Sequence, residues 1–254
     1  MKERKFLTVY LFFLTILLSA CGTSTPVNAQ SQPVSHAAFD QQLKKFVSAK
    51  GDVNYKGWLQ ERSGLQRYLK LLSDNAPNKK WSREDQLAYW INAYNAFTIE
   101  RILMDYPVKS IKDLGGPITF VNTVWDQKFF KIGGKDFSLN NIEHSVLRKD
   151  FKEPLIHFAI VCASASCPQL RNEAYTGAKI NAQLDEQARQ FINDPSKNRI
   201  SGNKAQLSEI FNWFASDFKK KGSVLQFVNT YARTPAAPNT KISYLPYDWS
   251  LNGK

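Results

Sequence analysis

Ser82-Arg-Glu-Asp-Gln-Leu-Ala-Tyr-Trp-Ile-Asn-Ala-Tyr-Asn-Ala-Phe-Thr-Ile-Glu-Arg-Ile-Leu-Met-Asp105 is the stretch that organises the chain. Its first residue is a favourable N-cap, acidic residues fill the first turn, and Pro107 follows its last residue closely. On a helix, Trp90, Tyr94 and Phe97 share one stripe. We therefore expect one long helix with an aromatic face.

The other predicted elements are also mostly helical. Helices are predicted over residues 39–49, 55–72, 139–149, 180–192, 207–218 and 223–231. A hairpin is predicted over residues 129–138 around Gly133-Gly134, and strands over residues 155–162 and 241–245. Because strands and helices do not alternate regularly, we predict an α+β fold: a mostly helical single domain around a small, mainly antiparallel sheet.

Residues 1–20 have the features of a bacterial lipoprotein signal peptide. A positively charged start precedes about a dozen apolar residues, which suits a signal peptide and is too short to span a bilayer comfortably. The run ends in Leu18-Ser-Ala-Cys21, a lipobox whose cysteine sulfur accepts diacylglycerol. We expect the mature chain to begin at lipidated Cys21, with a palmitate-type membrane anchor. The alternative is an uncleaved anchor or a secretory signal that is cut elsewhere.

The remaining chain divides into two parts. Residues 21–35 are rich in Ser, Thr, Pro, Gln and Asn and predict a flexible tether. Residues 36–254 are long enough for one globular domain with a sizeable core. Lipidation at Cys21 predicts a cell-envelope location. Gly22 is not an aspartate-type retention signal, so we expect the outer membrane, facing the periplasm, if the host has one.

The chain is strongly basic. Its formal charge is +12, and it remains +10 without residues 1–20, which hold three basic residues and one acidic residue. In the envelope the expected anionic partners are lipid head groups or a cell-wall polymer, and no nucleic acid is expected; a solvated lysine-rich surface is the alternative. Phosphate-loop, dinucleotide and Gly-x-Ser-x-Gly patterns are absent, and so is metal-ligand spacing. We therefore predict no cofactor and no metal.

Two cysteines remain besides the lipidation site. Cys162 and Cys167 are separated by four residues, and an oxidising compartment favours a disulfide between them. The alternatives are a free, reactive Cys162 and an exchangeable redox pair. The sequence leaves all three open.

The best candidate site is the loop that follows the predicted strand Leu155-Ile-His-Phe-Ala-Ile-Val-Cys162. Small residues follow this run directly and expose backbone N–H groups that could hold an anion. A nucleophilic Cys162 would need a base. In a regular strand, His157 would point away from Cys162, which leaves His144 as the candidate.

Glu143 is the most informative acid in the chain, because it falls on the apolar face of the helix predicted over residues 139–149. A buried carboxylate must be paired, protonated or beside a cavity. We predict either a structural ion pair with Arg101, or a pocket that Glu143 shares with His144 and Cys162. The third interpretation places Glu143 at the water boundary.

At these same residues the chain resembles the domain-of-unknown-function 547 family. The matching motifs are Leu87-Ala-Tyr-Trp-Ile-Asn-Ala-Tyr-Asn-Ala96, Ser138-Leu-Asn-Asn-Ile-Glu-His144 with Leu147-Arg148, His157-Phe-Ala-Ile-Val-Cys-Ala-Ser-Ala-Ser-Cys-Pro168 and Tyr244-Leu-Pro-Tyr-Asp-Trp-Ser-Leu-Asn252. The motifs span most of the folded region. The resemblance implies a single domain and a site at these residues, but it supplies no reaction.

Two functions fit these observations. The first is binding or scaffolding in the envelope through a pocket near Glu143, His144 and Cys162, with the two cysteines forming a disulfide. The alternative is a thiol-dependent hydrolase or acyl transferase with Cys162 as nucleophile and His144 as base. In the enzyme, Glu143 or Asp248 would orient the base, and Asn95 would polarise the substrate.

Overall fold

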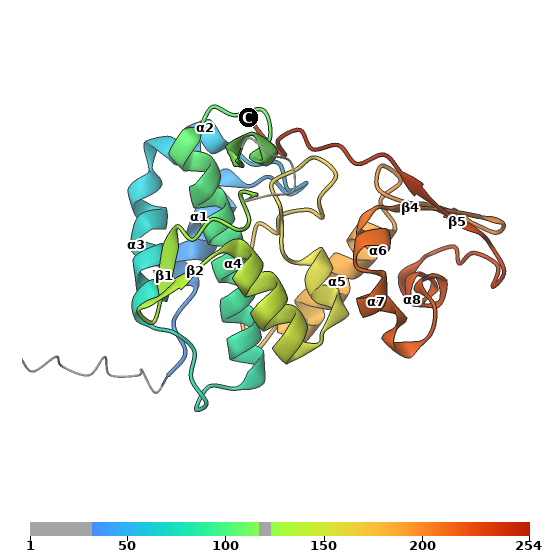
Figure 1. The fold of residues 1–254 in the computed structure, drawn as a ribbon, viewed down its shortest axis with the longest axis horizontal. Helices are drawn as coiled ribbons and strands as arrows, with labels where there is room; N and C mark the ends of the chain where they lie inside the picture. Colours follow the sequence, from blue (N-terminus) through green and yellow to red (C-terminus); the bar gives the residue numbers. More distant parts are fainter. Residues whose placement is uncertain (1–31, 117–122) are drawn as a thin grey trace, which may run out of the picture.

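The computed structural model describes residues 32–116 and 123–254, which form a mostly helical α+β fold with two small sheets (Figure 1). The predicted leader, Cys21 and most of the predicted tether lie outside these residues. Three helices open the described chain: α1 (Ala37–Phe46), α2 (Tyr55–Gln60) and α3 (Arg62–Asp74). The single helix predicted over residues 55–72 is therefore two helices. The backbone leaves the helical region at Glu61, and Trp58 and Leu65 on either side of the break are both fully buried.

Helix α4 (Arg83–Asp105) runs through the larger of the two main hydrophobic cores and confirms the long helix predicted from the sequence. The hydroxyl of Ser82 accepts a hydrogen bond from the backbone N–H of Asp85 at 3.0 Å, as an N-cap should. Two asparagines in the middle of the helix are buried, and their side chains hydrogen-bond the backbone of other segments. Asn92 bonds both backbone groups of Tyr175, and Asn95 does the same for the segment that leads to Cys162.

The predicted hairpin is confirmed. Strands β1 (Phe130–Ile132) and β2 (Lys135–Phe137) pair antiparallel, and both residues of the turn, Gly133 and Gly134, have positive φ. Positive φ at both central residues is what a two-residue type I′ turn needs, and glycine adopts it without steric cost. A short 3₁₀ helix, η1 (Ile111–Leu114), precedes the hairpin.

The next helix, η2 (Asn141–Phe151), has π-type hydrogen bonds and packs beside α4. Ser138 caps it, because its hydroxyl accepts from the backbone N–H of Asn141. The prediction of a capped helix is confirmed, but its type is not an ordinary α-helix. Bonds from residue i to i+5 are rare, and π segments occur frequently at functional sites. This helix carries Glu143, His144 and Arg148.

The strand predicted over residues 155–162 is wrong. The chain instead forms a 3₁₀ helix, η3 (Pro154–Phe158), followed by a turn. Proline at the first position suits a helix start, and the Glu153 side chain caps the N–H of Leu155. The segment is buried against α5 and η2 rather than in a sheet, and a short buried apolar run does not distinguish these two cases.

The C-terminal part builds a second core around Phe158. Helix α5 (Ile180–Ile192) has the predicted bounds, and α8 (Val224–Tyr231) confirms the helix predicted over residues 223–231, with Ser223 as its N-cap. The helix predicted over residues 207–218 is replaced by the end of strand β4 (Lys204–Ser208) and two short helices, α6 (Ile210–Trp213) and α7 (Ala215–Phe218). Strand β3 (Arg199–Ser201) precedes these elements, and the 3₁₀ helix η4 (Lys219–Lys221) follows them.

The last strand, β5 (Ile242–Leu245), pairs parallel with β4, while β3 pairs antiparallel with β4. After β5 the chain returns across the molecule to the N-terminal helices (Figure 1). It is fixed there by backbone bonds from Leu251 to Lys109 and between Lys254 and Val53. A side chain at Gly253 would collide with the backbone of Val53, so this close approach requires glycine.

None of the helices in residues 32–116 and 123–254 combines the length and the apolar character needed to span a bilayer.

Candidate functional site

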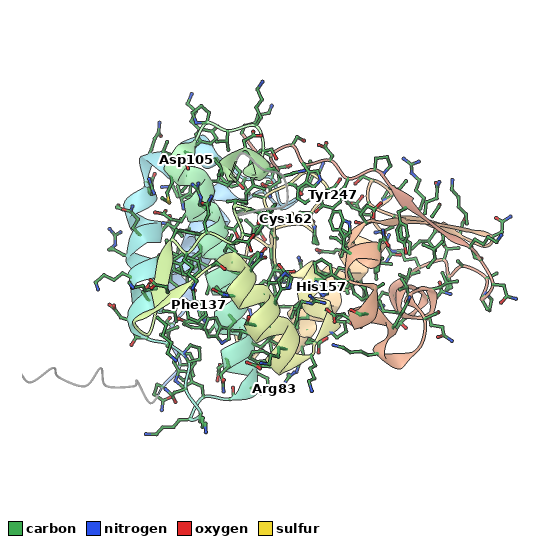
Figure 2. The ribbon with its side chains drawn as sticks, viewed as in Figure 1. Arg83, Asp105, Phe137, His157, Cys162 and Tyr247 are labelled. Atoms are coloured by element: carbon green, nitrogen blue, oxygen red, sulfur yellow. A yellow bond between two sulfur atoms is a disulfide. The ribbon has the colours of Figure 1, made fainter. Side chains whose placement is uncertain are left out.

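A cavity of about 190 Å³, which we call the aromatic pocket, lies where the two main cores meet. Figure 2 shows Cys162, Tyr247 and His157 around this central region. Aromatic rings form most of its wall, and a few polar groups join them. The lining residues that the argument uses are Tyr94, Trp125, Glu143, His144, His157, Cys162, Cys167, Trp213, Phe214, Tyr247 and Trp249. Glu143, His144 and Cys162, for which we predicted a shared pocket, all line this cavity, and its role as a binding site stays a prediction.

Glu143 lies deep in the pocket, and 7% of its surface is exposed. Its carboxyl group accepts one hydrogen bond, from the hydroxyl of Tyr94 at 3.3 Å. Burial raises the pKa of Glu143 to about 7, although the Arg148 cation and the Tyr94 bond act in the opposite direction. This carboxyl group can therefore donate or accept a proton near neutral pH.

His144 stands one residue further along η2, at the edge of the pocket, and Arg148 fixes its tautomer. The Arg148 guanidinium donates to Nδ1 of His144 at 3.0 Å. Because arginine only donates, Nδ1 is the acceptor and Nε2 carries the proton. Partial burial and the Arg148 charge both lower the pKa of His144. The imidazole is therefore neutral, with an N–H group left for a ligand.

Arg148 also belongs to a buried network that the sequence analysis missed. Its Nε donates to Asp217 at 2.6 Å, and Nε2 of His157 donates to the same carboxylate oxygen at 2.9 Å. These two donors, with the Arg148 charge, hold the pKa of Asp217 well below its usual range. Burial lowers the pKa of His157, and its ring stacks on Phe214 with centroids 4.0 Å apart. The network fixes η2, η3 and α7 to one another at the pocket wall.

The two cysteines form a disulfide, which was the first of the three predicted alternatives. Cys162 is half-buried and Cys167 is buried. The Cys162 sulfur lies 3.1 Å from the Ser164 hydroxyl and 3.3 Å from the Tyr247 hydroxyl. The backbone N–H of Cys162 donates to the Cys167 sulfur at 2.8 Å. Each sulfur thus has a hydrogen-bond donor beside it.

Three aromatic side chains form a cluster at the mouth of the pocket. Ring centroids of Tyr247 and Trp249 are 4.6 Å apart, and Trp213 lies 4.7 Å from Tyr247 and 5.7 Å from Trp249. Trp213 is 45% exposed, which is unusual for such a large apolar side chain. This cluster was not predicted from the sequence. The signal was the density of aromatic residues in Tyr244–Asn252, which no periodic pattern explained.

Several predicted site residues lie elsewhere. Arg101 pairs with Asp105 and Gln127, so the predicted ion pair with Glu143 does not form. Glu143 instead accepts a hydrogen bond from Tyr94 and lines the pocket. Asn95 does not line the pocket either, because both ends of its amide bond the backbone of residues 159 and 161.

Two further expectations need correction. Asp248 is exposed and accepts from the backbone N–H of Ser250, so it does not orient His144. His157 was expected to point away from Cys162, but both residues line the same pocket. The alternation of a strand does not apply to a 3₁₀ helix, in which successive side chains spread around the axis.

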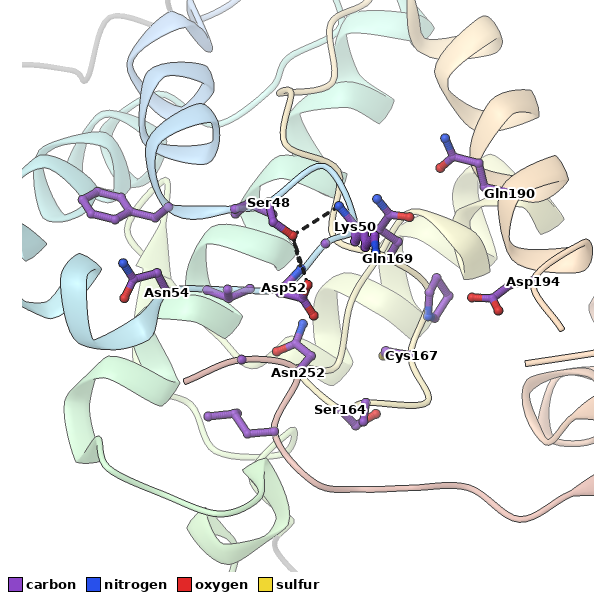
Figure 3. A pocket seen from close by; sticks show the side chains of 18 of the residues that line it. Ser48, Lys50, Asp52, Asn54, Ser164, Cys167, Gln169, Gln190, Asp194 and Asn252 are labelled. Atoms are coloured by element: carbon purple, nitrogen blue, oxygen red, sulfur yellow. Dashed lines mark hydrogen bonds between the residues drawn. The ribbon is translucent and has the colours of Figure 1, made fainter. Parts of the chain in front are cut away.

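A second, larger hollow of about 1070 Å³ lies on the other side of the cysteine loop (Figure 3). It shares Cys167 and Pro168 with the aromatic pocket. Its lining is mixed polar and apolar, and the Ser48 hydroxyl bonds the Asp52 carboxylate within it. Five lysines and two aspartates are among the lining residues.

The aromatic pocket combines apolar walls with a few hydrogen-bonding groups, as small-molecule sites do. The described residues bring no group of three or more His, Cys, Asp or Glu into an arrangement that could hold a metal ion. With the disulfide closed, the Glu143 carboxyl and the His144 N–H are two lining groups that could bind a polar ligand. Both suit recognition of hydroxyl or amide groups.

Residues 78–192 match the family model described as "Protein of unknown function, DUF547". The matched region holds α4, η2, the cysteine loop and α5, and therefore Glu143, His144 and both cysteines of the pocket. The aromatic cluster of Trp213, Tyr247 and Trp249 lies beyond it. Neither the curated proteins nor the solved structures contain a match to this chain.

Proposed function

We propose that the protein binds a polar, ring-bearing ligand of the sugar class in the aromatic pocket. One observation carries this proposal: an exposed tryptophan and two half-buried aromatic rings line a cavity that is also lined by a buried carboxyl group. Trp213 is 45% exposed, whereas Glu143 is 7% exposed. Flat aromatic faces offer contact to the C–H face of a sugar ring, and aromatic side chains dominate the energetics of binding surfaces.

The polar groups suit such a ligand. The Glu143 carboxyl can accept from a hydroxyl group, and Nε2–H of His144 can donate to one. A site whose polar groups are buried rejects ligands that leave these groups unpaired, which gives selectivity. The cavity of about 190 Å³ is smaller than a typical drug-sized site, so we propose that one ring unit enters it.

The place of this activity is the cell envelope. The lipobox and the charged leader support an anchor at Cys21, and a tether over residues 21–35 would hold the domain near the membrane surface. The ligand class then follows from the compartment: a sugar unit of a cell-wall polymer. The Cys21→Ser variant tests the anchor. The parent chain is expected in the membrane fraction with a lipid mass increment, and the variant without that increment.

Intrinsic tryptophan fluorescence tests the binding site. The purified protein is titrated with an oligosaccharide of N-acetylglucosamine, and a saturable change is expected. Trp213→Ala should weaken binding at least tenfold, because it removes an exposed stacking face. Tyr244→Ala is the matched control, since Tyr244 is also an exposed aromatic residue but does not line the pocket. Equal affinity in both variants, or no saturable change, would reject the sugar site.

A thiol-dependent hydrolase or acyl transferase is the second candidate. It is favoured by one observation, that Cys162, His144 and Glu143 line the same pocket. The closed disulfide weighs against it, because a nucleophile must be a free thiolate. Thiol titration under native and denaturing conditions separates the two functions. A free thiol that reacts in the native protein favours the enzyme, and no thiol before reduction favours the binding protein.

A further inference from the structure

We propose that the Cys162–Cys167 disulfide exchanges with dithiol substrates, with Cys162 as the sulfur that is attacked. This goes beyond ligand binding and does not depend on it. The two cysteines differ in their exposure to an incoming thiolate. Both cysteines line the aromatic pocket, but Cys162 is half-buried, whereas Cys167 is 5% exposed. An incoming thiolate can therefore reach one sulfur and displace the other.

Hydrogen-bond donors lie beside both sulfurs and can stabilise the thiolate that forms when the disulfide opens. The backbone N–H of Cys162 points at the Cys167 sulfur at 2.8 Å. The hydroxyls of Ser164 and Tyr247 lie 3.1 and 3.3 Å from the Cys162 sulfur, and the two hydroxyls are 3.2 Å apart. Donors that stabilise a thiolate speed its departure in thiol–disulfide exchange.

Hydrogen bonds, in addition to the disulfide, hold the backbone of the cysteine loop. Asn95 holds the backbone of residue 161 on one side. The returning C-terminal segment bonds residues 163, 165 and 166 through the backbone of residues 248–252. Ala163, between the cysteines, has φ of 57°, a conformation that a non-glycine residue holds only when its surroundings enforce it. The two sulfurs therefore stay close after reduction, so the bond can open and close again.

A substrate thiolate attacks the Cys162 sulfur, a mixed disulfide forms, and the electron pair of the broken bond leaves on Cys167. The second substrate thiolate then attacks the substrate sulfur of the mixed disulfide and releases Cys162. The substrate gains a disulfide, and the protein gains two thiols that take up the two substrate protons. The protein disulfide is the oxidant for one turnover.

The test is chemical trapping on the native protein. Glutathione is added to the purified, oxidised protein, the reaction is quenched with acid, and the mixed disulfide is located by mass spectrometry of peptides. Glutathione is expected on Cys162 at least tenfold more often than on Cys167. Opening should also be at least tenfold faster than exchange between glutathione and its own disulfide. Attachment to Cys167, or opening only in urea, would overturn the proposal.

Two further measurements keep the proposal testable if a cysteine variant does not fold. Cys167→Ser should capture oxidised glutathione on Cys162, while Cys162→Ser, its matched control, should react at less than a tenth of that rate. Circular dichroism of the fully reduced parent protein should show a folded chain that closes the disulfide again with a synthetic disulfide peptide. If reduction unfolds the protein, the disulfide is a structural crosslink and the proposal is wrong.

Discussion

Replacing Glu143 by glutamine should stabilise the protein at alkaline pH and leave its stability nearly unchanged at acidic pH. The side chain keeps its shape, and it can still accept a hydrogen bond from Tyr94. What changes is the charge: glutamine is neutral at every pH, whereas the carboxyl group must be ionised inside a buried site above its pKa.

The magnitude follows from the pKa of the buried carboxyl. Burial raises the pKa of Glu143 from 4.5 to about 7. In the unfolded chain this group loses its proton near its ordinary value, so the folded state binds more protons between these two values. Stability due to the neutral carboxyl is complete below pH 4.5 and is lost as pH rises to 7. At about 1.4 kcal/mol for each pH unit, the loss is about 3 kcal/mol.

Urea unfolding at pH 5 and pH 8, with the disulfide intact, measures this difference. The Glu143→Gln variant is expected to match the parent protein at pH 5 within 1 kcal/mol and to exceed it by about 2–3 kcal/mol at pH 8. Glu61→Gln is the control, because Glu61 is exposed beside Lys45 and such pairs contribute at most about 1 kcal/mol. A Glu143→Gln difference that is the same at both pH values would refute the account of a buried, uncompensated carboxyl.

Three other substitutions test the framework by urea or thermal unfolding. Asp217→Ala leaves the Arg148 and His157 donors of the network unpaired and should cost about 2–4 kcal/mol; a loss below 1 kcal/mol would mean that water replaces the carboxylate. Asn95→Ala removes partners from two buried backbone groups and should cost about 2–4 kcal/mol, with a change below 1 kcal/mol as the contrary result. Ser82→Ala deletes the α4 cap and should cost about 1 kcal/mol, and no change would show that the cap is not needed.

The parts of the fold that depend on local signals were predictable. The predicted Ser82 cap is present, and so is the turn at Gly133-Gly134. Each of these signals depends on interactions within four residues, so the local sequence is enough to predict it. The bounds of α5 agree with the prediction for the same reason, since its amphipathic pattern is regular.

The wrong predictions come from segments whose environment decides their structure. Residues 155–162 are apolar enough for a buried strand, but they pack among helices and are fixed by the Asn95 amide from a distant helix. Strands β3 and β4 were missed because their pairing with each other and with β5 is a tertiary contact. Propensity gives no information on such contacts.

The residues Glu143, His144 and Cys162 of the candidate site were predictable from the sequence, but the residues that surround them were not. An acid on an apolar helix face correctly indicated that Glu143 needs a cavity, and His144 and Cys162 share that cavity. The pairing of Arg148 with Asp217 was not predictable, because these residues are 69 positions apart and on different elements. The same holds for the aromatic cluster, which the returning C-terminal segment brings to the pocket.

Oxidative footprinting with a sugar ligand tests the central claim most directly. The protein is oxidised briefly with and without a saturating N-acetylglucosamine oligosaccharide, and the modification of each tryptophan is read by mass spectrometry. The account predicts that Trp213 and Trp249 become protected, while the half-buried Trp90, which lies on α4 outside the pocket, does not change. Unchanged modification of Trp213 and Trp249 at saturation would contradict a binding site in the aromatic pocket.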